Sequence, residues 1–232
     1  MDRIFIAIGG GELRVKTTLE MDRIAAAFAK QRAGERRANA LFFPTASHDS
    51  LPYFNTFRKT YTSELGMKSD VVLLTKKEVP LAKNAAKIAA ADLIYLGGGD
   101  TVHLIETLHR FGVDKMILDA YRRGAVLVGL SAGAICWFDE MYSDTNIMRQ
   151  SGEGYSVYRG MGLIKGLISP HYNQRQKDFD AVVTERQGVA FAIEDNAALL
   201  FRNEAPERAL SSGGRCYRLE ASPKGLLRTF LK

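Results

Sequence analysis

The chain has 232 residues, of which 46% are hydrophobic and 25% are charged. These proportions are typical of a globular protein and exclude an intrinsically disordered chain. The formal net charge of +6 comes from basic residues that are dispersed along the sequence, so it does not favour nucleic-acid binding. A chain of this length can bury one full core, and we expect residues 1–232 to form a single α/β domain.

The apolar segments and the cysteines exclude further classes of protein. The longest apolar runs, such as residues 4–8, are far shorter than the roughly 20 residues of a membrane span, and no signal-peptide pattern is present. Two cysteines, Cys136 and Cys216, make a disulfide framework improbable and fit a reducing compartment. We therefore predict a cytoplasmic protein without membrane contact. No metal and no cofactor is predicted, because no zinc-like spacing joins the cysteines and the histidines, which are His48, His103, His109 and His171.

Short apolar segments rich in β-branched residues recur along the first half of the chain, at residues 4–8, 40–43, 71–74, 93–96 and 126–128. Apolar side chains at helical spacing lie between them, within residues 19–28, 54–65 and 102–111. This alternation predicts βαβ units and a mostly parallel central sheet with helices on both faces. Catalytic groups are then expected at the carboxyl ends of the strands.

The second half of the chain has a different pattern. Residues 139–165 are rich in Gly, Ser and Tyr and predict a long loop or small subdomain near the site. A helix is expected over residues 174–187. The remaining apolar segments predict a β-rich carboxyl third, with antiparallel pairs at the sheet edge, at residues 189–193, 197–202, 208–212, 216–220 and 226–231.

A Gly-x-Ser-x-Gly motif, from Gly129 to Gly133, directly follows the expected strand at 126–128 and precedes an apolar helical stretch. A nucleophile elbow has this context, with small residues around a tight strand-to-helix turn that exposes Ser131. The N–H of Ala132 can then face a developing oxyanion. The alternative is a simple glycine-rich turn in which Ser131 only caps a helix.

A serine hydroxyl becomes a good nucleophile when a base accepts its proton, and His171 is the candidate base. It follows an apolar run and Pro170, which restricts the approach of the chain. Gly98 and Gly99, at the end of the strand 93–96, can add an N–H to the oxyanion hole. A phosphate cradle is the competing interpretation, although the G-x-G-x-x-G spacing and the P-loop lysine are missing.

Three blocks of sequence resemble the corresponding blocks of the peptidase E family, the serine dipeptidases that also include the cyanophycinases. They are LIYLGGGDTVHL (93–104), GAVLVGLSAGA (124–134) and ISPHY (168–172). Their order and spacing agree with the family, and the resemblance extends to about residue 200. It implies a flavodoxin-like fold similar to the class I glutamine amidotransferases, with serine where those enzymes place cysteine.

The resemblance also implies roles for further residues. Glu194 is expected to be the acid that orients His171, and Asp144 is the alternative. Peptidase E has glycine after its glutamate, whereas this chain has Asp195. His103 stands where peptidase E carries an amide, so it is a candidate substrate contact.

The resemblance implies hydrolysis of dipeptides that begin with aspartate. An alignment places Gln174 at the position of the family's specificity arginine, with Arg175 beside it, so this preference stays open. We expect a small-peptide hydrolase that works through an acyl-enzyme, as a monomer or homodimer, without nucleic-acid or membrane partners. The alternatives are a cyanophycinase-like exopeptidase and a non-catalytic small-ligand binder of the same fold.

Overall fold

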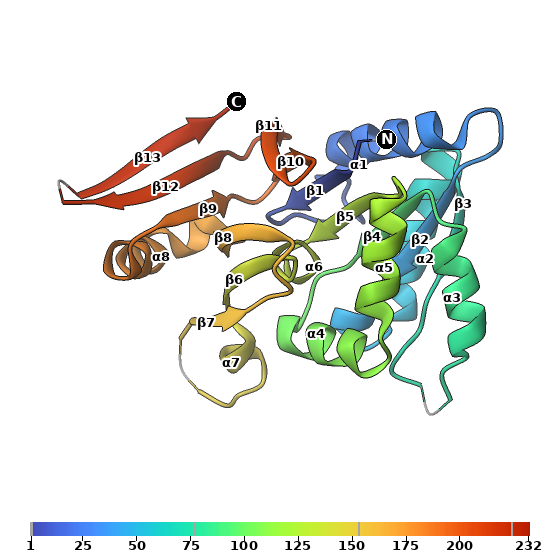
Figure 1. Ribbon diagram of the computed structural model, residues 1–232, viewed down its shortest axis with the longest axis horizontal. Helices are drawn as coiled ribbons and strands as arrows, with labels where there is room; N and C mark the ends of the chain where they lie inside the picture. Colours follow the sequence, from blue (N-terminus) through green and yellow to red (C-terminus); the bar gives the residue numbers. More distant parts are fainter. Residues whose placement is uncertain (1, 77, 153, 224) are drawn as a thin grey trace.

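The computed structural model describes residues 2–76, 78–152, 154–223 and 225–232. In this part of the chain the strands form a seven-stranded sheet and a six-stranded sheet, and helices cover both (Figure 1). No helix within these ranges is long and apolar enough to cross a lipid bilayer.

The seven-stranded sheet has the strand order β11-β10-β1-β5-β4-β2-β3. The five strands from the first half of the chain pair in parallel, while β10 and β11 add an antiparallel edge. This confirms the predicted mostly parallel sheet, although β3 begins three residues earlier than expected. The strands are β1 (Ile4–Ile8), β2 (Asn39–Phe43), β3 (Lys68–Val71), β4 (Leu93–Leu96), β5 (Val126–Leu130), β10 (Ala197–Arg202) and β11 (Ala205–Ser211).

Helices cover both faces of this sheet, as the sequence predicts. Side chains alternate along β1, so that Ile6 packs with the cluster under α1 and α2, while Phe5 packs with the cluster under α4 and α5. The helices on the first face are α1 (Leu19–Ala33), α2 (Leu51–Arg58) and its π-helical continuation η2 (Lys59–Glu64). Those on the second face are α3 (Leu81–Ala89), α4 (Thr101–Arg110) and α5 (Val113–Arg122), and the short η1 (Thr45–Ser47) follows β2.

The six-stranded sheet has the order β13-β12-β9-β8-β6-β7 and differs from the sequence prediction. Of the strands in the carboxyl third, only β10 and β11 extend the main sheet. The others form the second sheet together with residues 139–165, which contain strands rather than mostly loop. Periodicity identifies a strand but not its partner. The elements are β6 (Phe138–Ser143), β7 (Ser156–Arg159), β8 (Ile164–Ser169), β9 (Val189–Ile193), β12 (Cys216–Ser222) and β13 (Gly225–Leu231), with α6 (Ala132–Ile135), α7 (Thr145–Met148) and α8 (Tyr172–Arg186).

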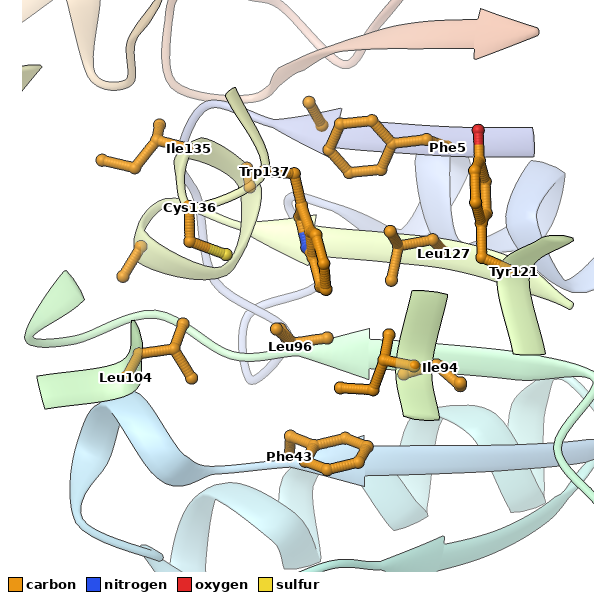
Figure 2. Packing of buried hydrophobic residues seen from close by; sticks show 14 of the residues in the cluster. Phe5, Phe43, Ile94, Leu96, Leu104, Tyr121, Leu127, Ile135, Cys136 and Trp137 are labelled. Atoms are coloured by element: carbon orange, nitrogen blue, oxygen red, sulfur yellow. The ribbon is translucent and has the colours of Figure 1, made fainter. Parts of the chain in front are cut away.

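The segment that leaves β5 and enters the second sheet is packed into the core. Trp137 is fully buried, and in Figure 2 its indole lies beside Leu127 of β5 and Leu96 of β4. Cys136 and Ile135 of the same segment are buried in this cluster too. Packing on both sides therefore fixes the backbone immediately after Ser131.

Candidate active site

Ser131 occupies the turn between β5 and α6 with φ 50° and ψ −111°. A non-glycine residue rarely adopts a positive φ, and such a conformation costs about 1–3 kcal/mol unless its surroundings impose it. The surroundings here are tight, because a Cβ on Gly129 would lie 2.0 Å from the carbonyl oxygen of Gly133. Ser131 therefore stands at the apex of a tight strand-to-helix turn.

His171 lies beside this serine, and its Nε2 is 2.9 Å from the Ser131 Oγ. The residue follows β8 and has a left-handed backbone, with φ 48°, which directs the chain into α8 at Tyr172. A heavy-atom distance of this size suits direct proton transfer. The structure thus brings together the predicted nucleophile and the predicted base.

The carboxylate on the other side of the imidazole belongs to Asp195, whose Oδ1 is 2.6 Å from the His171 Nδ1. Its second oxygen, Oδ2, accepts hydrogen bonds from the amides of Asn173 (3.0 Å) and Gln174 (2.7 Å). Burial alone would raise the pKa of Asp195, but the hydrogen bonds from Asn173, His171 and Gln174 outweigh it and leave that pKa below its ordinary value. Asp195 is therefore ionised at neutral pH.

This geometry corrects the expectation for the acid. The side chain of Glu194 turns away from the imidazole and accepts a hydrogen bond from the Tyr217 hydroxyl at 3.3 Å. Asp144, the alternative, accepts from the guanidinium of Arg175 at 2.9 Å. Glu194 directly follows β9, and successive side chains of an extended chain point in opposite directions, so the next residue reaches the histidine.

Backbone bonds from the loop after β1 position the serine and histidine. The amide of Ser131 donates to the carbonyl of Ile8 at 2.9 Å, and the amide of His171 donates to that of Gly9 at 3.1 Å. The next carbonyl, of Gly10, accepts from the amide of Asn196 at 3.0 Å. Three consecutive carbonyls, from the last residue of β1 and the first two of the following loop, thus hold the three segments that carry the site.

Gly10 was not among the residues predicted for the site. In the structure it lies directly under the His171–Asp195 pair, where a Cβ would come within 1.9 Å of the Asp195 Oδ1 and 2.5 Å of the His171 Nδ1. Only a residue without a side chain fits this position. The sequence signal at this position was a run of glycines after a buried strand. This signal did not indicate that His171 and Asp195 would lie against it.

Two of the three predicted oxyanion donors are next to Ser131, since Ala132 follows it in the chain and a Cβ on Gly98 would lie 3.5 Å from the Ser131 Cβ. Ala132 is the first residue of α6, so its N–H has no acceptor within the helix. The N–H of Gly98 donates to the Tyr53 hydroxyl at 3.3 Å. Among the described residues no hydrogen bond uses the N–H of Gly99, which leaves Gly99 and Ala132 as the unoccupied donors.

The candidate substrate contacts have different surroundings. Gln174 is bound to Asp195 and thus belongs to the hydrogen-bond network of the histidine. Arg175 is only 4% exposed, with its guanidinium 4.7 Å from the ring centre of Tyr155. His103 packs against His48, with ring centres 4.2 Å apart, and burial lowers the pKa of His103.

Comparison with known proteins identifies the family. The model of peptidase family S51 matches residues 5–208. The chain belongs to peptidase family S51. Among the curated relatives of this S51 peptidase is the uncharacterized peptidase YgaJ of Bacillus subtilis (strain 168), which is 28% identical over 92% of this chain and 90% of its own length.

Solved structures share the fold of this S51 peptidase. A peptidase from an acI-B1 actinobacterium has a TM-score of 0.72, with 20% identity over 97% of this chain and 93% of its own. A putative peptidase E protein from Listeria monocytogenes EGD-e has a TM-score of 0.65, with 20% identity over 91% of this chain and 99% of its own. These similarities confirm the peptidase E resemblance and the predicted fold class.

Proposed function

We propose that the chain is a serine-type peptidase that hydrolyses small peptides through a Ser131–His171–Asp195 triad. The observation that carries the proposal is the continuous chain of short contacts, 2.9 Å from Oγ to Nε2 and 2.6 Å from Nδ1 to Oδ1. An ionised Asp195 that accepts a hydrogen bond from the Nδ1–H keeps the proton on that nitrogen and leaves Nε2 as the free base toward the serine. These two distances support the proposal without reference to the family to which the chain belongs.

The proposed reaction follows from these positions. Ser131 Oγ attacks the peptide carbonyl carbon while His171 Nε2 takes its proton, and the oxyanion that forms is stabilised by the N–H groups of Ala132 and Gly99. The imidazolium then gives the proton to the leaving amine, and the C–N bond breaks to leave an acyl-serine. Water repeats the sequence on the ester, with His171 as base, and releases the acid and the free serine.

Arg175 supports a preference for acidic substrates within this proposal. It lies one helical turn after His171 in α8, and its ion pair is with Asp144, a side chain that is 35% exposed. A substrate carboxylate of the same chemistry can replace the Asp144 carboxylate on the guanidinium. We infer a dipeptidase that favours aspartate at the first position.

Hydrolysis of a dipeptide panel by the wild type and by Ser131→Ala tests the proposal. We expect Ser131→Ala to lower kcat by about 10⁴–10⁶-fold while the melting temperature stays close to that of the wild type, since only one partly buried oxygen is removed. Within the panel, Asp at the first position should exceed Asn and Gly. A wild type that cleaves no di- or tripeptide and no ester is instead a non-catalytic binder.

A further inference from the structure

A small cavity opens beside the nucleophile on the side of the sheet covered by α1 and α2. Its volume is about 190 Å³, and its lining comes from the loop after β1, the start of α2 and the last residue of β5. The lining residues are Gly11, Glu12, Leu13, Arg14, Tyr53, Thr56 and Leu130. Leu130 immediately precedes Ser131 in the chain, so the cavity adjoins the strand end that carries the nucleophile.

Tyr53 connects the cavity to the strand end that borders the serine. Its hydroxyl oxygen accepts the N–H of Gly98, and a Cβ on Gly98 would lie 3.5 Å from the Ser131 Cβ. Among the described residues no acceptor receives the phenolic proton of Tyr53. Burial raises the pKa of Tyr53 above its ordinary value, so this proton stays in place and can be donated at neutral pH.

The lining indicates which side chains fit. Leu13 and Leu130 are 3% and 6% exposed and form an apolar floor, while Glu12 and Arg14 pair at 3.8 Å at the exposed mouth. The volume is below the roughly 300 Å³ at which sites for drug-sized ligands begin, so it holds one side chain rather than a whole peptide. The opposite charges at the mouth give no preference for either sign.

We propose that this cavity binds one uncharged side chain of up to leucine size, from a residue next to the scissile bond, and that the Tyr53 hydroxyl donates a hydrogen bond to the bound substrate. The inference rests on the proposed peptidase function and adds a second subsite. It is lined by the loop after β1, α2 and the end of β5, whereas Arg175 belongs to α8, so the two subsites come from different elements.

A cavity-filling variant tests the subsite. Thr56 lines the cavity from α2, and Thr56→Phe should reduce kcat/KM at least about tenfold for a dipeptide with leucine at the bound position, relative to its glycine counterpart. Asn55→Phe adds the same ring on the exposed side of that helix, outside the cavity, and should leave this ratio within about twofold. Hydrolysis of p-nitrophenyl acetate, which has no such side chain, should be unaffected by Asn55→Phe.

A second pair of variants tests the hydroxyl. Tyr53→Phe should raise KM about 3- to 10-fold with less than a twofold change in kcat, the loss of one ground-state hydrogen bond. Tyr95→Phe is the matched control, because Tyr95 belongs to the same aromatic cluster and its buried hydroxyl has no partner among the described residues. Its kinetics should equal those of the wild type.

The outcomes separate this inference from the proposed function. Unchanged leucine-to-glycine ratios in Thr56→Phe, with hydrolysis that still requires Ser131, would overturn the subsite and leave the peptidase proposal intact. Equal kinetics of Tyr53→Phe and Tyr95→Phe would overturn the role of the hydroxyl. A wild type without Ser131-dependent hydrolysis removes the proposed function and the subsite with it.

Discussion

Two adjacent carboxylates, Glu194 and Asp195, have different surroundings, and only Asp195 contacts the imidazole of His171. Asp195→Asn removes the acceptor that fixes the histidine tautomer, so we expect kcat to fall about 10³–10⁴-fold with little change in KM. Glu194→Gln is the matched control and should stay within about threefold of the wild type. Steady-state kinetics on any cleaved dipeptide measures kcat and KM of the two variants. A greater loss of kcat in Glu194→Gln than in Asp195→Asn would assign the role of the acid to Glu194 instead.

The sequence identified Ser131 and His171 because each stands in a short motif whose geometry is local. It did not identify Asp195, because the choice between two neighbouring acids depends on the direction of the chain as it leaves β9, which a one-residue shift reverses. Gln174 was interpreted as a substrate contact because the sequence does not indicate which distant residue its side chain bonds. Its amide bonds Asp195, a residue 21 positions away.

Helix α1 carries a buried carboxyl whose ionisation opposes folding. Burial raises the pKa of Asp22 from 3.8 to about 7, although the hydroxyls of Thr18 and Tyr61 donate to it at 2.7 and 2.9 Å. Between these two pH values the native state keeps a proton that the unfolded state releases. Stability is therefore lost as pH rises through the window, by up to about 1.4 kcal/mol per pH unit.

Asp22→Asn should remove this loss, because its neutral amide has no charge to desolvate. We expect a higher urea midpoint at pH 8 and a flatter dependence of that midpoint on pH between 4 and 7. Asp119→Asn, at a carboxylate that is 58% exposed in α5, should leave the slope unchanged. An equally steep slope in Asp22→Asn would show that other groups cause it.

The strands and helices of the first half were predictable because segments with strand and helix periodicity alternate there, although only β2 with β3 and β4 with β5 pair in chain order. The strand order of the second sheet was not predictable. In this sheet β8 pairs with β6 and β9 in parallel, and β9 also pairs with β12. The alternation of apolar residues does not indicate any of these pairings. The approximate start of α8 was predictable, but the helix begins at Tyr172, directly after His171 turns the chain in the left-handed conformation.

At the scale of the whole molecule, the two sheets share one core. Phe138 and Ile168 of the second sheet lie in the same cluster as Phe5 and Leu127 of the first. We therefore expect one cooperative thermal transition, with equal calorimetric and van't Hoff enthalpies. Differential scanning calorimetry measures both, and two resolved transitions would contradict the single-domain prediction.

The loop after β1 has a consequence for how the protein is made. Its carbonyls and the amide of Gly9 bond Ser131, His171, Asn196 and Ala197, all of which are synthesised more than 100 residues later. At about 5–20 residues per second, the ribosome adds Asp195 several seconds after Ser131. In a nascent chain Ser131 therefore lacks His171 and Asp195 until those residues have been added, so the proposed triad can form only after Asp195 has left the ribosome.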